Sequence, residues 1–269
     1  MNYRKNSKVL ETFLNDNGVM RFNLNSPENL NALSENMMDL IQNGLDKASL
    51  DKNVRVIIIS GEGSTFSSGH DLKALKAARK SADKGKKYFL TIMKKCSKMM
   101  QTIIKCPKPI IAEVAGTATA AGCQLVASCD LAYASSSAKF ATPGVNIGLF
   151  CSTPMVAISR NLSNKHSMEM LLTGELISSD KASKIGLIND VVEKSTLKDF
   201  VLNKAQNISK KSSVTLKIGK EAFYKQLDMK LSDAYDYASK VMVQNMLKLD
   251  AKEGIDAFID KREPIWKDK

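Results

Sequence analysis

The chain has 269 residues, enough for one large domain or for one domain with a small appendage. Its apolar fraction of 43% and charged fraction of 25% are ordinary for a globular protein, and no apolar stretch is long enough to cross a bilayer. The formal net charge of +12 makes a polyanionic partner worth testing. The lysines are spread along predicted helix faces without interleaved aromatic residues, so we expect no nucleic-acid partner and no membrane partner.

The cysteines and histidines limit the redox and metal chemistry. The five cysteines form no C-x-x-C pair and their number is odd, which indicates reduced thiols. The two histidines, His70 and His166, are too few for a His-rich metal site, so we expect no metal. The N-terminal residues show no apolar signal region and no cleavage site. We therefore expect a cytoplasmic location, either a bacterial cytosol or, after removal of a presequence, the mitochondrial matrix.

Strand-like and helix-like segments alternate through the first two thirds of the chain. Alternating apolar residues predict a strand over 19–24, and helical spacing predicts a helix after Ser34, its expected N-cap. Buried strands are predicted over 54–60 and 109–116, with a long helix over about 88–104 between them. A helix opened by Ala121, a strand over 131–134 and a loop over 140–145 follow.

From about Ser195 the pattern becomes almost wholly helical. Strands with crossover helices, followed by a helix-only tail, predict the α/β class. We expect a core over residues 1–194 and a C-terminal helical region over 195–269.

Two of the predicted buried strands lead into loops of small residues. One loop is Phe66–Lys73, and the other precedes Ala121 and Gly122. An isolated glycine loop more often serves only a tight turn. Two such loops can aim backbone N–H groups at one developing negative charge, which is how enzymes stabilise an oxyanion.

Four segments in this order and spacing resemble the crotonase (enoyl-CoA hydratase/isomerase) superfamily: Leu30–Ser34, Phe66–Lys73, Gly116–Asp130 and Phe140–Gly148. The resemblance covers essentially the whole chain. It implies a spiral of ββα units, followed by helices that mediate trimerisation. It further implies an acyl-CoA thioester ligand and a homotrimer or a dimer of trimers. Coenzyme A is then part of the substrate, and no separate cofactor is expected.

The resemblance also implies which residues form the site. The backbone N–H groups of His70 and Ala121 would polarise the thioester carbonyl, and the helix opened by Ala121 would favour the negative charge through its dipole. Every residue except proline keeps its N–H, so a histidine at position 70 leaves the donor in place. The implied residues for substrate and CoA binding are Asn31, Ala32, Ser68, Asp71, Leu72, Lys73 and Gly122.

The chain departs from the family at the residues that transfer protons. The two family glutamates fall on Gln124 and Gly144. Hydration of an enoyl thioester needs a carboxylate to take a proton from water and a carboxylic acid to supply one. A carboxamide cannot exchange protons at neutral pH, and glycine has no side chain. We therefore expect hydratase activity to be weak or altered.

Other residues could replace the glutamates. We favour an imidazole of His70 that points away from the site and a Cys151 that is a buried structural thiol. Asp71 is expected to cap or brace its loop, and Ser152 stands where isomerase relatives place an aspartate. Two other functions stay open: a non-catalytic acyl-CoA-binding regulatory protein and, on charge alone, a nucleic-acid binder.

Overall fold

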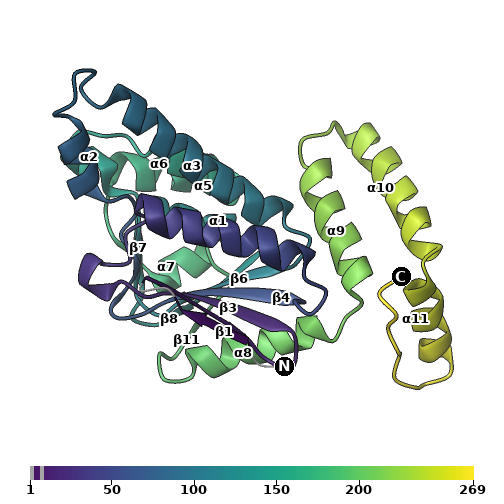
Figure 1. Cartoon of the computed structure of the whole chain (residues 1–269). Coiled ribbons are helices and arrows are strands. Elements are labelled where there is room, and N and C mark those ends of the chain that lie inside the picture. The colour runs from purple at the N-terminus through teal and green to yellow at the C-terminus, as the bar shows by residue number, and fades with distance from the viewer. Residues whose placement is uncertain (1–2, 7–8) are drawn as a thin grey trace.

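Two β-sheets, of seven and four strands, organise the fold (Figure 1). The structure is a computed structural model that describes residues 3–6 and 9–269. Residues 1, 2, 7 and 8, which belong to the N-terminal stretch used for the location, lie outside the described ranges. The larger sheet has the order β1-β2-β3-β4-β6-β8-β11, and its strands are β1 (Tyr3–Asn6), β2 (Leu10–Leu14), β3 (Val19–Leu24), β4 (Val56–Gly61), β6 (Ile110–Val114), β8 (Leu131–Ser135) and β11 (Asp190–Val192).

The smaller sheet has the order β10-β9-β7-β5 and the strands β5 (Thr65–Ser67), β7 (Thr117–Thr119), β9 (Lys139–Ala141) and β10 (Ile177–Ser178). Strands β4, β6 and β8 are parallel neighbours in the large sheet, and β5, β7 and β9 are parallel neighbours in the small one. Each turn of the chain therefore gives one strand to each sheet before a helix follows. This confirms the predicted α/β spiral of ββα units.

The helices are η1 (Pro27–Asn29), α1 (Glu35–Leu50), α2 (Leu72–Ala78), α3 (Lys86–Lys105), α4 (Ala121–Ser128), η2 (Pro143–Ile147), α5 (Ser152–Ile158), α6 (Asn164–Thr173), α7 (Ser179–Lys184), α8 (Leu197–Ser209), α9 (Ser213–Gln226), α10 (Leu231–Met246) and α11 (Leu249–Ile259). The long predicted elements are confirmed, including Ser34 as the N-cap of α1 and Ala121 as the first residue of α4. The prediction of a plain loop over 140–145 was wrong, because β9 and η2 lie there. A strand of three residues is too short to show a period in the sequence.

Strand β4 is buried on both faces and joins two hydrophobic cores. Ile57 and Ile59 belong to the larger core, to which α1 and α3 contribute, whereas Val56 and Ile58 pack in a smaller core with residues of α8. Successive side chains of a strand point to opposite faces, so this continuous apolar run needs cover on both sides. Figure 1 shows α1 and α3 on one side of the large sheet and α8 on the other.

A polar cluster attaches α9 to the rest of the fold. The ammonium group of Lys220 donates to Asp130 Oδ2 at 2.6 Å and to the carbonyls of Ile103 and Lys108, and the Tyr224 hydroxyl donates to Asp130 Oδ1 at 2.9 Å. No residue of α9 or α10 is buried. Helices α9 to α11 stand apart from the sheets in Figure 1. The helices of the described part include none long and apolar enough to cross a membrane.

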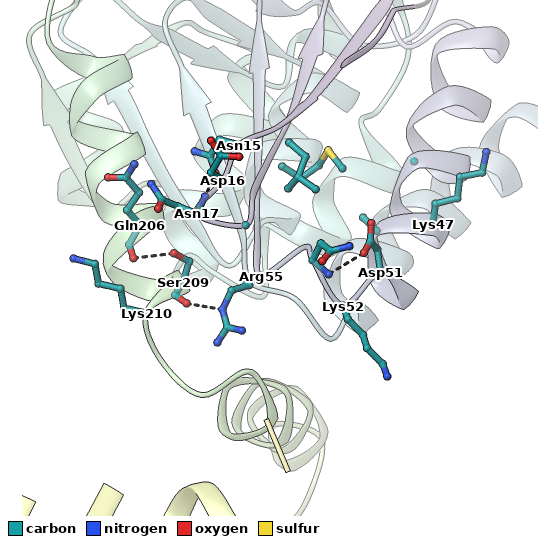
Figure 2. Close-up of a pocket in the computed structure, with 16 residues that line it drawn as sticks. Asn15, Asp16, Asn17, Lys47, Asp51, Lys52, Arg55, Gln206, Ser209 and Lys210 are labelled. Carbon is teal, nitrogen blue, oxygen red and sulfur yellow. Dashed lines mark hydrogen bonds between the residues drawn. The ribbon is translucent and has the colours of Figure 1, made fainter. Parts of the chain in front are cut away.

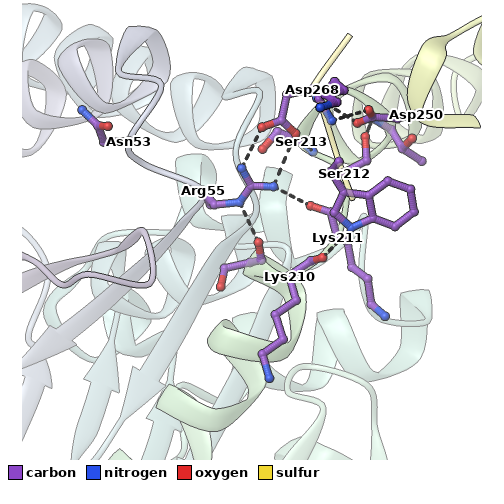
Figure 3. Close-up of polar contacts among 12 residues, drawn as sticks. Asn53, Arg55, Lys210, Lys211, Ser212, Ser213, Asp250 and Asp268 are labelled. Carbon is purple, nitrogen blue, oxygen red and sulfur yellow. Dashed lines mark hydrogen bonds and ion pairs between the residues drawn. The ribbon is translucent and has the colours of Figure 1, made fainter. Parts of the chain in front are cut away.

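A second polar cluster holds the C-terminal tail (Figure 3). Arg55, directly before β4, donates to the carbonyls of Ser209 and Lys211 at 2.6 and 2.8 Å and to Asp268 Oδ2 at 2.8 Å. The carboxylate of Asp250 accepts from the backbone N–H groups of Lys267 and Asp268. One arginine therefore links the start of β4, the α8–α9 turn and the end of the chain.

Candidate functional site

The two small-residue loops touch each other. Gly69 has φ +88°, and an ideal Cβ at this position would lie 2.9 Å from the amide nitrogen of Ala121. A Cβ at Gly122 would overlap the carbonyl of Ser67. The Thr119 hydroxyl donates to the Ser68 carbonyl at 3.2 Å. The glycines are thus needed for close backbone approach, and they bring the backbone near His70 against the first turn of α4.

The amides of His70 and Ala121 are both available as donors. Neither donates a hydrogen bond to another described residue, and no side chain caps α4. The preceding residue, Ala120, has φ 50° and ψ −120°, which costs a non-glycine residue roughly 1–3 kcal/mol. Two unpaired N–H groups on adjacent loops, one at a helix N-terminus, can together bind a negatively polarised oxygen.

The imidazole of His70 is enclosed by protein. Neither ring nitrogen has accessible surface or a hydrogen-bond partner among the described residues. Burial lowers the pKa of His70 below its ordinary value near 6.5, and the nearby Leu33 carbonyl offsets part of that shift. The ring is therefore neutral at pH 7.

Gln124 lies one turn after Ala121 on the same face of α4. Its side chain is buried, and Oε1 has neither accessible surface nor a hydrogen-bond partner in the described part of the chain. An unpaired buried acceptor costs about 1–3 kcal/mol. The amide is therefore not a hydrogen-bonded brace of the fold.

No side chain larger than hydrogen fits at position 144 in this arrangement. An ideal Cβ on Gly144 would lie 2.7 Å from the Leu149 carbonyl oxygen and 2.9 Å from Cys151 Sγ. The sulfur of Cys151 thus occupies space that a longer side chain at 144 would need. Cys151 is buried and free, as expected, and burial raises the pKa of its thiol, opposed in part by a backbone contact with Gly144.

The residues implied in CoA binding fall into two groups: residues that are buried or half-buried, and residues at the start of α2. Asn31 is fully buried: its Oδ1 accepts from the Ser26 N–H at 2.8 Å, and its Nδ2 donates to the carbonyls of Glu62 and Thr65. This side chain ties η1 to the β4–β5 connection, a role that nothing in the sequence indicated. Ala32 and Ser68 are half-buried.

Asp71 caps α2, as expected, by accepting from the N–H groups of Lys73 and Ala74. Leu72 and Lys73 are exposed on the first turn of α2, directly after His70. Leu33 donates its N–H to the Gly69 carbonyl at 2.7 Å and so joins the segment 30–34 to the loop that contains His70. Segments 30–34 and 66–73, separate in sequence, therefore form one surface.

Two carboxylates follow or lie in the strands that lead to the site, and both have other partners. Glu113 receives two hydrogen bonds from Arg21, at 2.8 and 2.9 Å. It shares the face of β6 with Ile111, which packs in the α8 core. Glu62 Oε1 accepts from Asn23. Within residues 3–6 and 9–269, no group of three or more His, Cys, Asp or Glu side chains is arranged to hold a metal ion.

A large cavity lies elsewhere (Figure 2). It measures about 1150 Å³ and its lining includes Asn15, Lys47, Asp51, Arg55, Gln206 and Lys210. Gly18 and Arg55 directly precede β3 and β4, whereas the two small-residue loops follow β5 and β7. The cavity is open and mixed in charge, and none of the residues implied by the motifs lines it. We therefore place the candidate site at the two loops.

Comparisons with known proteins agree with this architecture. A family model described as enoyl-CoA hydratase/isomerase matches residues 15–269. The Xenopus laevis protein named enoyl-CoA hydratase domain-containing protein 3, mitochondrial, is 47% identical over 251 residues, which cover 93% of this chain and 84% of the relative. The crystal structure of an enoyl-CoA hydratase from Mycobacterium smegmatis superimposes with a TM-score of 0.92 at 40% identity, covering 97% of this chain and 99% of that one.

The crystal structure of human enoyl-CoA hydratase domain-containing protein 3 gives a TM-score of 0.89 at 42% identity and covers 98% of this chain and 99% of that chain. The match extends through both small-residue loops and the C-terminal helices. The chain therefore belongs to the enoyl-CoA hydratase/isomerase (crotonase) family and, within it, to the subgroup named enoyl-CoA hydratase domain-containing protein 3.

Proposed function

We propose that this protein binds an acyl-CoA thioester and polarises its carbonyl between the N–H groups of His70 and Ala121. The observation that carries the proposal is the contact between the two loops, which leaves both amides unpaired. Each such donor typically contributes about 10²–10³ in rate when an oxyanion develops. The CoA portion would lie near Asn31–Ala32 and the exposed ammonium of Lys73, and exposed Leu149 and Phe150 offer apolar surface beyond Gly144.

We propose that hydration is weak or altered, although the names of the relatives include hydratase. Gln124 can hold a water molecule but cannot take its proton. At position 144 the Cys151 sulfur stands where a carboxylate would have to pass. General acid–base catalysis is worth about 10²–10⁴ per group, so a chain without either carboxylate loses a large part of the rate.

Hydration of crotonyl-CoA by the purified protein tests this part of the proposal. We expect a turnover at least about 10²-fold below that of an ordinary hydratase measured in the same assay. The variant Gln124→Glu, which keeps the side-chain volume, should raise hydration. A wild-type turnover in the ordinary range would show that neither position limits the reaction.

Calorimetric titration tests the binding. We expect butyryl-CoA to bind more tightly than free CoA, because only butyryl-CoA has a thioester carbonyl that the two amides can bind. Equal affinity for both ligands would contradict the oxyanion assignment.

The absence of a glutamate at positions 124 and 144 also supports a second function, that of a non-catalytic acyl-CoA-binding regulatory protein. Tight binding without isomerase, thioesterase or decarboxylase turnover favours that second function.

We propose a homotrimer or a dimer of trimers, built through the C-terminal helices. Phe223, Tyr235 and Phe258 are 57%, 69% and 84% exposed on α9, α10 and α11. Large apolar side chains in such numbers usually mark an interface. Light scattering gives the mass of the particle in solution, and a monomer would contradict the proposal.

We also propose a location in the mitochondrial matrix or in a bacterial cytosol. One similar protein is named mitochondrial and another comes from a bacterium, so both compartments stay in the proposal.

A further inference from the structure

Most of the positive charge of the chain lies in one hairpin of two helices. This basic hairpin, residues 72–105, consists of α2, the connection 79–85 and α3. It contains eleven Lys or Arg residues and one acidic residue, Asp83, whereas the whole chain carries a net charge of +12. Of these bases, only Lys95 forms an ion pair across the described ranges, with Glu35 and Asp39 of α1. The other ten bases are exposed, so the hairpin is a large surface of unneutralised charge.

Four lysines of α3 form a line on the exposed face of the helix. Lys94, Lys98 and Lys105 lie seven, eleven and eighteen residues after Lys87, close to whole numbers of turns, so their side chains share one face. The line is about 27 Å long at 1.5 Å per residue. An open depression of about 410 Å³ is lined by three of the four lysines and by three neutral polar side chains of the same helix. The surface that α3 offers to a partner is therefore basic and polar.

The basic hairpin begins at the candidate site. Asp71, which caps α2, directly follows His70, whose N–H is one of the two proposed donors. Lys105 lies near the start of β6, at the opposite end of that strand from the loop that precedes Ala121. The few phosphate groups of one CoA molecule need positive charge only beside the site. The extent of the hairpin therefore indicates an anionic partner of the size of a protein.

The other side chains of the hairpin favour a protein over a membrane or a nucleic acid. Leu72 and Leu90 are each 55% exposed among the bases, and protein interfaces combine such apolar contacts with a charged rim. A helix that lies on a membrane needs an exposed apolar face, but the apolar face of α3 is buried in the larger core. Tyr88 and Phe89 are half-buried, and the Phe89 ring lies under the Arg79 guanidinium, so they offer no stacking surface for bases.

The thioester chemistry of the proposed site selects the kind of acidic protein. A second copy of this chain does not fit, because a symmetric contact through the hairpin would bring like charges together. Acyl carrier proteins are small acidic proteins that bear acyl groups as thioesters on a phosphopantetheine arm, the arm that CoA also has. We propose that the basic hairpin docks an acyl carrier protein, whose arm delivers the acyl thioester to the N–H groups of His70 and Ala121. The inference rests on the proposed function and extends it from acyl-CoA to carrier-bound acyl groups.

Titration with three ligands tests the inference: a bacterial acyl carrier protein loaded with a butyryl thioester, butyryl-CoA, and vesicles of anionic phospholipid. A triple variant that combines Lys80→Gln, Lys87→Gln and Lys94→Gln removes three exposed charges of the hairpin and none of the residues implied in CoA binding. We expect this variant to bind the loaded carrier about tenfold more weakly than the wild type does, and butyryl-CoA within about twofold of the wild type. Raised ionic strength should weaken carrier binding more in the wild type than in the variant.

A second triple variant, which combines Lys194→Gln, Lys198→Gln and Lys204→Gln, is the matched control. These lysines are exposed on α8 or just before it, across the large sheet from α3 in Figure 1. Their loss changes the net charge by the same amount. Binding of the loaded carrier should stay within about twofold of the wild type.

Three results would overturn the inference. One is binding of butyryl-CoA without binding of the loaded carrier, which leaves the proposed function standing. Another is an equal loss of carrier binding in the two triple variants, which would assign the effect to net charge alone. The third is binding to the anionic vesicles, lost in the hairpin variant, without affinity for the carrier, which would make the hairpin a membrane-docking surface. Failure of both the carrier and butyryl-CoA to bind would remove the proposed function and this inference with it.

Discussion

Gly144→Ala is expected to destabilise the protein, because the structure has no room for a methyl group there. The new Cβ would lie 2.7 Å from the Leu149 carbonyl oxygen and 2.9 Å from Cys151 Sγ, well inside the ordinary 3.4–4 Å contact distance. The backbone of Leu149 cannot simply move away, since its N–H donates to the Gly144 carbonyl at 2.9 Å. Overpacking of this kind costs about 1–3 kcal/mol, and we expect a loss of about 2 kcal/mol in the free energy of unfolding.

Urea unfolding followed by circular dichroism, at one protein concentration, measures this loss. Gly219→Ala is the matched control: no atom lies within 4 Å of its Cβ, and alanine in the interior of α9 should stabilise by about 0.5–1 kcal/mol. In a Cys151→Ala background the cost of Gly144→Ala should fall by roughly 1 kcal/mol, because one of the two close contacts is removed. A Gly144→Ala protein within about 0.5 kcal/mol of the wild type would refute the steric reasoning, and with it our claim that a glutamate cannot fit.

Three other predictions concern the strained turn, the α9 anchor and the buried imidazole. Ala120→Gly should raise the free energy of unfolding by about 1 kcal/mol, because glycine relieves a positive φ; an unchanged or lower value in urea unfolding would contradict the strain. Lys220→Met should lower it by about 3 kcal/mol and make α9 to α11 sensitive to limited proteolysis, because the Asp130 carboxylate loses its charged partner at a largely enclosed site, whereas Lys217→Met, at an exposed position, should change little. Burial lowers the pKa of His70, so the unfolded chain binds a proton that the folded chain does not; stability should be full above pH 6.5 and decline as the pH falls from 6.5 toward the folded pKa. Urea unfolding over this range should show the decline in the wild type and in the exposed-site control His166→Ala but not in His70→Ala, and its persistence in His70→Ala would assign it to other groups.

Most of the elements that could be predicted from the sequence are long enough to show a periodic spacing of apolar residues. The strand over 19–24 and the helix capped by Ser34 both have several apolar residues at a regular spacing. The smaller sheet escaped prediction because its strands have two or three residues, and they form only where consecutive turns of the chain lie side by side. The smaller sheet therefore depends on how consecutive turns of the spiral lie against each other, and no single segment of the sequence indicates it.

The candidate site, too, could be predicted only in part from the sequence. Glycine and alanine spacing located the two loops, because close backbone approach needs small residues at fixed positions. The role of Asn31 could not be predicted, since its partners Glu62 and Thr65 are more than thirty residues away in the chain. The sequence showed that Gly144 lacks a carboxylate, but only the folded loop reveals that Cys151 fills the space beside it.

The alternation of the chain between the two sheets has a consequence for insertions and deletions. The β4–β5 connection consists of residues 62–64, and the β6–β7 connection of residues 115 and 116. A Cβ on Gly116 would overlap the Ser64 carbonyl, so these two connections lie against each other. One added residue in either would shift the following strand by a register step and reverse the directions of its side chains. Residues 79–84, between α2 and α3, are exposed and lie in no sheet. Natural length variation should therefore collect at 79–84, whereas the two short connections keep a constant length in any relative that retains both amides.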